Sequence, residues 1–233
     1  MKRFYRTSGT EVLTGGHGVT LDGRPVKTPR RATLMVPTAG LAAAIANEWD
    51  GQGETVDPEI MPLMRLATTA IDRVGPERAA ILEDLTAYGG SDLICYRTDS
   101  PAELAQRQME AWQPFVDWAA ARHDALLAVT SGILHVEQPE PAVSALARAL
   151  EGLDDFHLMA AHTLTVSTGS LVIALAFLDR HVDGAAAFEA GCLDDLYALE
   201  VWGDDRDAWE RLDGLKASIL AVERFISLLH TEG

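Results

Sequence analysis

The segment EVLTGGHGVTLDGRPVKTPRRATLMVPTAGLAAAIANEWD, residues 11–50, contains a change from strand-like to helix-like sequence around which the fold is organised. Two runs suited to strands, 11–21 and 24–36, flank the dipeptide Asp22-Gly23. Asp-Gly favours a two-residue hairpin turn, because both positions tolerate a positive φ. We therefore expect a small antiparallel meander at this end of the chain.

Helical periodicity begins immediately after the meander. Thr38 is a good N-cap residue, and Leu41, Ile45 and Trp49 follow at four-residue spacing on one helical face. Beyond residue 58 almost every segment has the helical period, and the last five helices are predicted over 141–151, 154–166, 170–181, 184–202 and 205–230.

These patterns predict an α+β fold. Residues 1–58 would form a small β-rich N-terminal domain with one helix, and residues 59–233 a larger all-α C-terminal domain.

Charge is distributed unevenly along the chain. The 233 residues contain 19 Lys and Arg against 35 Asp and Glu, a net charge of −16. Residues 1–40 hold seven basic and two acidic side chains, so the remainder carries a net −21. A protein that binds nucleic acid needs a basic surface, so this balance argues against a nucleic-acid partner.

The sequence contains no convincing membrane span or reactive thiol. Residues 158–178 lack charged side chains, but the unbroken apolar run is only 171–178, so we expect a buried helix and no stable membrane insertion. Cys95 and Cys192 are expected to be buried small hydrophobic residues.

No familiar catalytic or nucleotide-binding motif is present. The sequence lacks G-x-x-x-x-G-K-[ST], H-E-x-x-H and G-x-S-x-G, and we predict no cofactor and no metal. Asp154 and His157 could share one helical face, which leaves a metal-dependent hydrolase as an alternative. The competing interpretation is an acidic first turn of a helix.

An acidic residue interrupts an apolar stripe in the predicted helix 184–202. On a helical wheel for 188–202, Asp195 falls among the apolar positions, which include Trp202. Asp194, Tyr197 and Glu200 lie outside them. A carboxylate on a buried face must be paired, hydrogen-bonded or protonated. Asp195 therefore either bonds a neighbouring helix or belongs to a docking surface.

Several sequence strings together resemble the assembly chaperones of the F-type ATP synthase that act on the α subunit of its catalytic head. In chain order they are KRFY at 2–5, LDGRPVKTP at 21–29, EWD-x-Q at 48–52, MPLMRLATTAIDRV at 61–74, DLICYR at 92–97, W-x-P-x-x-x-W at 112–118 and LYALEVWG at 196–203.

The resemblance implies a chaperone that is not an enzyme. Such a protein would bind the unassembled α subunit transiently and prevent its aggregation until it pairs with the β subunit. We expect a monomer in the bacterial cytoplasm, or in the mitochondrial matrix if this is a mature organelle protein. An adaptor for another protein client is the remaining alternative, because it would share the same composition.

The resemblance also suggests which residues contact the client. The family's acidic run before a tyrosine matches Asp194 and Asp195, and the residues around it are Tyr197, Glu200 and Trp202. In the N-terminal part, Arg24 and Lys27 lie in family motifs. These two side chains would form either a docking patch or the solvent face of strands.

Overall fold

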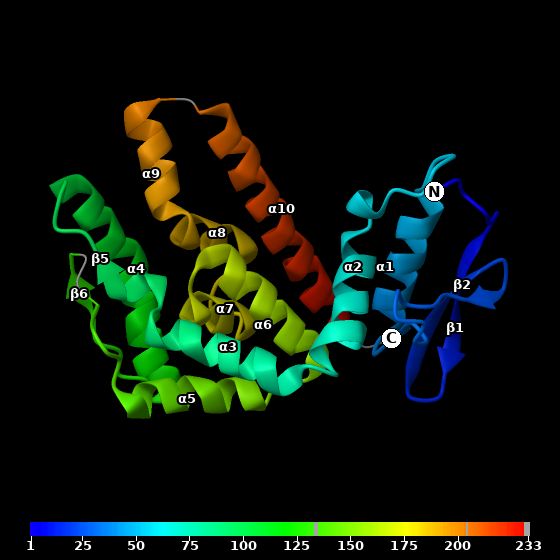
Figure 1. Cartoon of the computed structure of the whole chain (residues 1–233), viewed down its shortest axis with the longest axis horizontal. Helices are drawn as coiled ribbons and strands as arrows, with labels where there is room; N and C mark the ends of the chain where they lie inside the picture. Colours follow the sequence, from blue (N-terminus) through cyan, green and yellow to red (C-terminus); the bar gives the residue numbers. More distant parts are fainter. Residues whose placement is uncertain (133–134, 204, 231–233) are drawn as a thin grey trace. The chain divides into compact units, whose positions relative to one another are not determined.

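The computed structural model describes residues 1–132, 135–203 and 205–230 (Figure 1). The chain divides into two compact units, Met1–Arg78 with Ala221–Gly233, and Ala79–Leu220. A four-stranded sheet lies in the first unit, and the second unit consists mainly of helices. The predicted α+β class is therefore confirmed.

The sheet of the first unit is organised around its second strand. It contains β1 (Ser8–Leu13), β2 (Gly16–Leu21), β3 (Arg24–Pro25) and β4 (Met35–Val36). The strand β2 pairs antiparallel with β1, β3 and β4. The expected strand over 24–36 is therefore two short strands, both of which pair with β2.

The Asp22-Gly23 hairpin forms as predicted. Both residues have positive φ, 48° and 74°, which is the backbone that this two-residue turn requires. The Asp22 carboxylate also accepts hydrogen bonds from the backbone N–H groups of Thr7 and Arg6, each at 3.0 Å. These bonds hold the pKa of Asp22 below its usual value. Asp22 thus occupies the first position of the turn and also anchors the segment before β1.

The helix α1 (Ala39–Asp50) covers the sheet. Thr38 caps it as expected, because its hydroxyl accepts a hydrogen bond from the N–H of Leu41. Leu41, Ile45 and Trp49 are all buried, which confirms the predicted core face. The helix contacts β1, β2 and β4, so its apolar stripe and the inner sheet face form the core of this unit.

Glu48 on α1 connects this helix to the helical segment that follows it in the first unit. The short helix η1 (Pro58–Ile60) precedes α2 (Pro62–Thr69), which continues into the π-helical turn η2 (Ala70–Val74). The Glu48 carboxylate accepts hydrogen bonds from the N–H groups of Leu63 and Met64, both at 2.8 Å, and so caps the start of α2. The predicted domain boundary after residue 58 falls inside this compact unit.

The second unit is a packed group of helices. In chain order its elements are α3 (Arg78–Gly90), η3 (Leu93–Cys95), β5 (Tyr96–Arg97), α4 (Ala102–His123), β6 (Thr130–Ser131), α5 (Glu140–Glu151), α6 (Asp155–Thr168), α7 (Leu171–Leu178), α8 (Gly184–Gly191), α9 (Leu193–Trp202) and the first turns of α10 (Arg206–Leu229).

The apolar helix α7 lies at the centre of this unit. Every residue from Leu171 to Phe177 is buried. The buried carboxylate of Asp92 accepts hydrogen bonds from the N–H groups of Ile94 and Val172, and so caps both η3 and α7. Burial raises the pKa of Asp92 to about 6, although these hydrogen bonds act in the opposite direction.

The predicted continuous helix 184–202 is wrong, because the chain leaves helical geometry at Cys192 with φ −106° and ψ 15°. Gly191 lies so close to α6 that an added Cβ would be 2.6 Å from the Cβ of Thr168. The break lets Gly191 pack against α6 while α9 leaves in another direction (Figure 1). This contact between distant segments has no signature in the local sequence.

No helix among the residues that the structure describes is both long enough and apolar enough to cross a membrane. The charge-free stretch 158–178 instead contains most of α6 and all of α7, separated at Gly169, whose φ is 71°.

Candidate functional site

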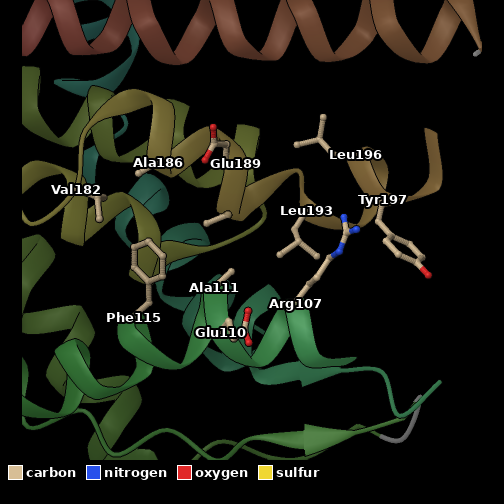
Figure 2. A pocket seen from close by; sticks show the side chains of 11 residues that line it. Arg107, Glu110, Ala111, Phe115, Val182, Ala186, Glu189, Leu193, Leu196 and Tyr197 are labelled. Atoms are coloured by element: carbon tan, nitrogen blue, oxygen red, sulfur yellow. The ribbon is translucent and has the colours of Figure 1, made fainter. Parts of the chain in front are cut away.

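A groove in the second unit is lined by residues of α4, α8 and α9 (Figure 2). Its volume is about 510 Å³, within the range of about 300–1,000 Å³ that is usual for ligand clefts. We call it the α4–α8 groove and define it by its aliphatic residues and one phenylalanine, Ala111, Phe115, Val182, Ala186, Ala190, Leu193 and Leu196.

Small side chains explain why the groove is hollow. Ala111 on α4 and Ala186 and Ala190 on α8 present single methyl groups to the space between these helices. A hydrogen bond joins these two helices, because the buried indole N–H of Trp112 on α4 donates to the carbonyl of Ala190 on α8 at 2.8 Å. The space in the groove is thus determined by the backbone positions of α4 and α8 and not by flexible side chains.

Each carboxylate of α9 that the sequence singled out has a partner on a neighbouring helix. Asp194 accepts a hydrogen bond from the buried side chain of Gln108 on α4 at 2.7 Å. Asp195 forms an ion pair with Arg211 on α10 at 2.8 Å. Glu200 forms an ion pair with Arg107 on α4, described next.

Arg107 is surrounded by acidic and aromatic groups at one end of the groove (Figure 2). It donates to both carboxylate oxygens of Glu200, at 2.6 and 2.9 Å, and to Glu103 at 2.7 Å. Its guanidinium carbon lies 5.2 Å from the ring centre of Tyr197. Hydrogen bonds to Glu200 and then Glu103 raise the pKa of Arg107, so the guanidinium remains charged and its charge is compensated locally.

Two aromatic residues of α9 differ from the helical-wheel prediction. Tyr197, placed outside the apolar stripe, is only 7% exposed. Trp202, placed within the stripe, is 82% exposed, and its neighbour Val201 is 51% exposed. The wheel assumed one straight helix over 188–202, and the break at Cys192 rotates the faces of α9 relative to those of α8.

Arg24 and Lys27 lie in the first unit, on the surface of the sheet. Both are exposed and border a hollow of about 460 Å³ that also contacts Phe4, Tyr5 and Trp49. The ammonium group of Lys27 donates to the hydroxyl of Thr33 at 2.9 Å. The predicted site residues are therefore distributed over two surfaces, one in each compact unit.

The structure adds groove residues that the sequence analysis missed. Arg107, Gln108, Glu110 and Glu189 line the α4–α8 groove or bond its α9 wall. The sequence does contain the four-residue spacing of Glu103 and Arg107, which is typical of an ion pair on a helix. It contains no signal for the partners on α9.

The alternative hydrolase site is a helix cap. Asp154 accepts hydrogen bonds from the backbone N–H groups of Phe156 and His157, and its second oxygen lies 2.9 Å from Nδ1 of His157. Among the described residues, no group of three or more His, Cys, Asp or Glu side chains is placed to hold a metal ion. The pair thus has the structural role of an N-cap.

Both cysteines are buried, as expected. Burial raises the pKa of Cys95 to about 12 and that of Cys192 to about 11. Nearby carboxylates add to both shifts. A thiol with such a pKa is protonated at neutral pH and is a poor nucleophile.

Known proteins resemble the chain over nearly its whole length. The sequence model of the ATP12 chaperone protein family matches residues 2–120. The mitochondrial protein atp12 of Schizosaccharomyces pombe is 24% identical over 98% of this chain and 84% of its own.

Solved structures extend the match to the fold. The crystal structure of Atp12 from Paracoccus denitrificans has a TM-score of 0.93 and 38% identity over 98% of both chains. A putative chaperone from Agrobacterium tumefaciens has a TM-score of 0.92 and 35% identity over 98% of this chain and 86% of its own. These matches confirm the resemblance to assembly chaperones of the ATP synthase, which are not enzymes. The chain belongs to the ATP12 chaperone family.

Proposed function

We propose that this chaperone binds the unassembled α subunit of the F-type ATP synthase catalytic head and protects it from aggregation until the β subunit pairs with it. Family membership supports a role in assembly of the ATP synthase. The motifs that resemble chaperones of the α subunit, LDGRPVKTP at 21–29 above all, support the choice of client.

The observation that carries the proposal is the exposed end of α9. Trp202 and Val201 present a large aromatic and a branched aliphatic side chain to solvent, 82% and 51% exposed. Tryptophan is enriched among the residues that dominate binding energy in protein interfaces. The end of α9 thus has the composition of a docking point for an apolar client surface.

The net acidic charge around α9 would guide the client to this point. Asp194 is exposed without an ion pair among the described contacts, and Glu200 and Glu103 together outweigh the single charge of Arg107, whereas Arg211 compensates Asp195. Complementary charge raises the association rate more than it raises affinity. Tyr197, which is buried, would position Arg107 and the α9 helix rather than contact the client.

The basic residues of the first unit would form a second contact. Arg24 and Lys27 are exposed beside the aromatic hollow of Phe4 and Trp49, and arginine and aromatic side chains are enriched in protein interfaces. Their charge is opposite to that of α9, so the two surfaces would select different parts of one client.

Release by the β subunit is physically reasonable. The interfaces between subunits of an obligate ring are large and apolar, and they favour aggregation while they are exposed. A monomeric chaperone that covers part of such an interface would be displaced by the larger natural contact. We place this exchange in the bacterial cytoplasm or the mitochondrial matrix, since the relatives include bacterial and mitochondrial proteins.

The proposal is tested with purified α and β subunits of the same ATP synthase. The tagged chaperone should capture α when α is offered alone, capture no β, and lose α when β is added. Capture of neither subunit, although both are folded, would contradict the proposal and favour an adaptor for another client.

A matched pair of variants tests the docking point. Trp202→Ala should weaken capture of α, because it removes the exposed indole at the end of α9. Val166→Ala is the control, since Val166 is an apolar residue of α6 that is 54% exposed. Equal capture by both variants would show that the end of α9 is not the docking point.

A further inference from the structure

We infer that the α4–α8 groove binds one amphipathic helix of the client, whose apolar stripe is flanked on both sides by lysine or arginine. The inference deepens the proposed function by specifying the segment that is recognised, and it rests on that function for the identity of the client.

The lining explains the apolar stripe. Phe115 and Ala190 are buried at the floor, while Leu193 and Leu196 are partly exposed along the α9 wall. Ala111 and Ala186 leave space between α4 and α8 that no side chain of the groove fills. A row of aliphatic side chains inserted there would be removed from water, which is the main favourable contribution to such contacts.

The charges explain the flanking basic residues. Glu110 lies on α4 and Glu189 on α8, so each wall carries one exposed carboxylate (Figure 2). Arg107 adds little net positive potential, because Glu103 and Glu200 both pair with it. A helix with cations on both sides of its apolar stripe matches this pattern, and an acidic helix would be repelled.

The walls explain why the occupant is a helix. They are formed by α4, α8 and α9, whose backbone groups are engaged within the helices themselves. An extended segment would bring unpaired N–H and C=O groups onto an apolar floor, which is unfavourable. A helix satisfies its own backbone and needs only side-chain contacts, as in other complexes that place an amphipathic helix in a groove.

The first test measures binding of two synthetic helical peptides by fluorescence anisotropy. Both have the same leucine stripe at helical spacing, and they carry either lysine or glutamate on its two sides. The lysine peptide should bind at least about tenfold more tightly at low salt, with the difference shrinking in concentrated salt. Equal binding of the two peptides, or binding of neither, would overturn the inference.

The second test uses variants of the chaperone. Ala186→Trp fills the groove and should reduce binding of the lysine peptide at least about tenfold, because the inserted stripe has no space. Ala185→Trp is the matched control, since Ala185 is the adjacent exposed residue on α8 and does not line the groove. Equal loss in both variants, with both folded by circular dichroism, would also overturn the inference.

If Ala186→Trp does not fold, reversing the charges on the two groove walls still tests the inference. Glu110→Lys with Glu189→Lys should abolish the preference for the lysine peptide, whereas Glu83→Lys with Asp84→Lys, two exposed acids on α3, should leave it unchanged. A preserved preference in the groove double variant would refute the assignment of the walls.

Capture of the α subunit separates failure of this inference from failure of the proposed function. If the unmodified chaperone captures α and Ala186→Trp captures it equally well, the groove inference is refuted and the proposed function stands. If the unmodified chaperone binds the lysine peptide but captures no α, the proposed client is wrong and the groove assignment stands.

Discussion

The Asp195→Lys substitution reverses a charge on α9 that is paired with Arg211 on α10. The two side chains are 46% and 52% exposed, so water and salt screen the pair strongly. An exposed ion pair contributes about 0.2–1 kcal/mol to the free energy of unfolding, and the new repulsion between Lys and Arg would be of similar size. The total destabilisation is therefore about 0.5–2 kcal/mol.

That loss is too small to unfold the protein. Domains have free energies of unfolding of about 5–15 kcal/mol, so Asp195→Lys should keep its helical circular dichroism and an unfolding midpoint within several degrees of the original. If Asp195 contacts the client, capture of the α subunit should nevertheless fall at least about tenfold, because like charges brought together in an interface cost several kcal/mol.

Two further variants distinguish docking from a structural role through Arg211. Arg211→Ala removes the same ion pair and leaves the carboxylate of Asp195 available, so capture of α should be retained if Asp195 docks. The double variant Asp195→Lys with Arg211→Asp restores an ion pair in which α9 carries the positive charge and α10 the negative charge. It should still fail to capture α, because the carboxylate at position 195 is missing. Loss of capture in Arg211→Ala, or its recovery in the double variant, would refute a docking role for Asp195.

Three other outcomes are expected from stability measurements by denaturant unfolding. Trp112→Ala should destabilise the protein by about 3–5 kcal/mol, because this side chain is fully buried, whereas Trp202→Ala should change stability by less than about 0.5 kcal/mol; similar effects would contradict the assigned burial. Gly191→Ala should destabilise by about 1–3 kcal/mol, since its Cβ has no room, whereas Gly214→Ala, in an open position on α10, should stabilise by about 0.5–1 kcal/mol; a tolerated Gly191→Ala would disprove the close approach. Burial raises the pKa of Asp92 to about 6, so the folded state binds more protons than the unfolded state between about pH 4 and 6. The stability of the original protein relative to Asp92→Asn should therefore rise by up to about 3 kcal/mol as the pH falls from 7 to 4, and a constant difference would refute the shift.

Local sequence signals predicted the elements of the first unit well. Asp22-Gly23 forms the hairpin, and Thr38 caps the helix that buries Leu41 and Ile45. Turn and cap preferences act over two to four residues, so they can be read without knowledge of the tertiary structure. The capping of α2 by Glu48 could not be read in this way, because it joins two helices across a linker.

The region around α9 shows where local reasoning fails. A helical wheel identified Asp195 as unusual, but it assumed a helix that in fact breaks at Cys192. It therefore placed Tyr197 and Trp202 on the wrong faces. The partner of Glu200 is Arg107, 93 residues away, and hydrophobic periodicity carries no information on such a pair.

The amino-acid sequence was sufficient to predict the α+β class, the early hairpin and, through its motifs, membership of a chaperone family. These depend on short-range backbone preferences and on sequence strings that can be recognised one at a time. The α4–α8 groove, the pairing of the carboxylates of α9 and the exposure of Trp202 became visible only when the helices were packed. The physical reason is that each depends on contacts between distant segments, such as that of Trp112 with Ala190, 78 residues apart, which local preferences do not encode.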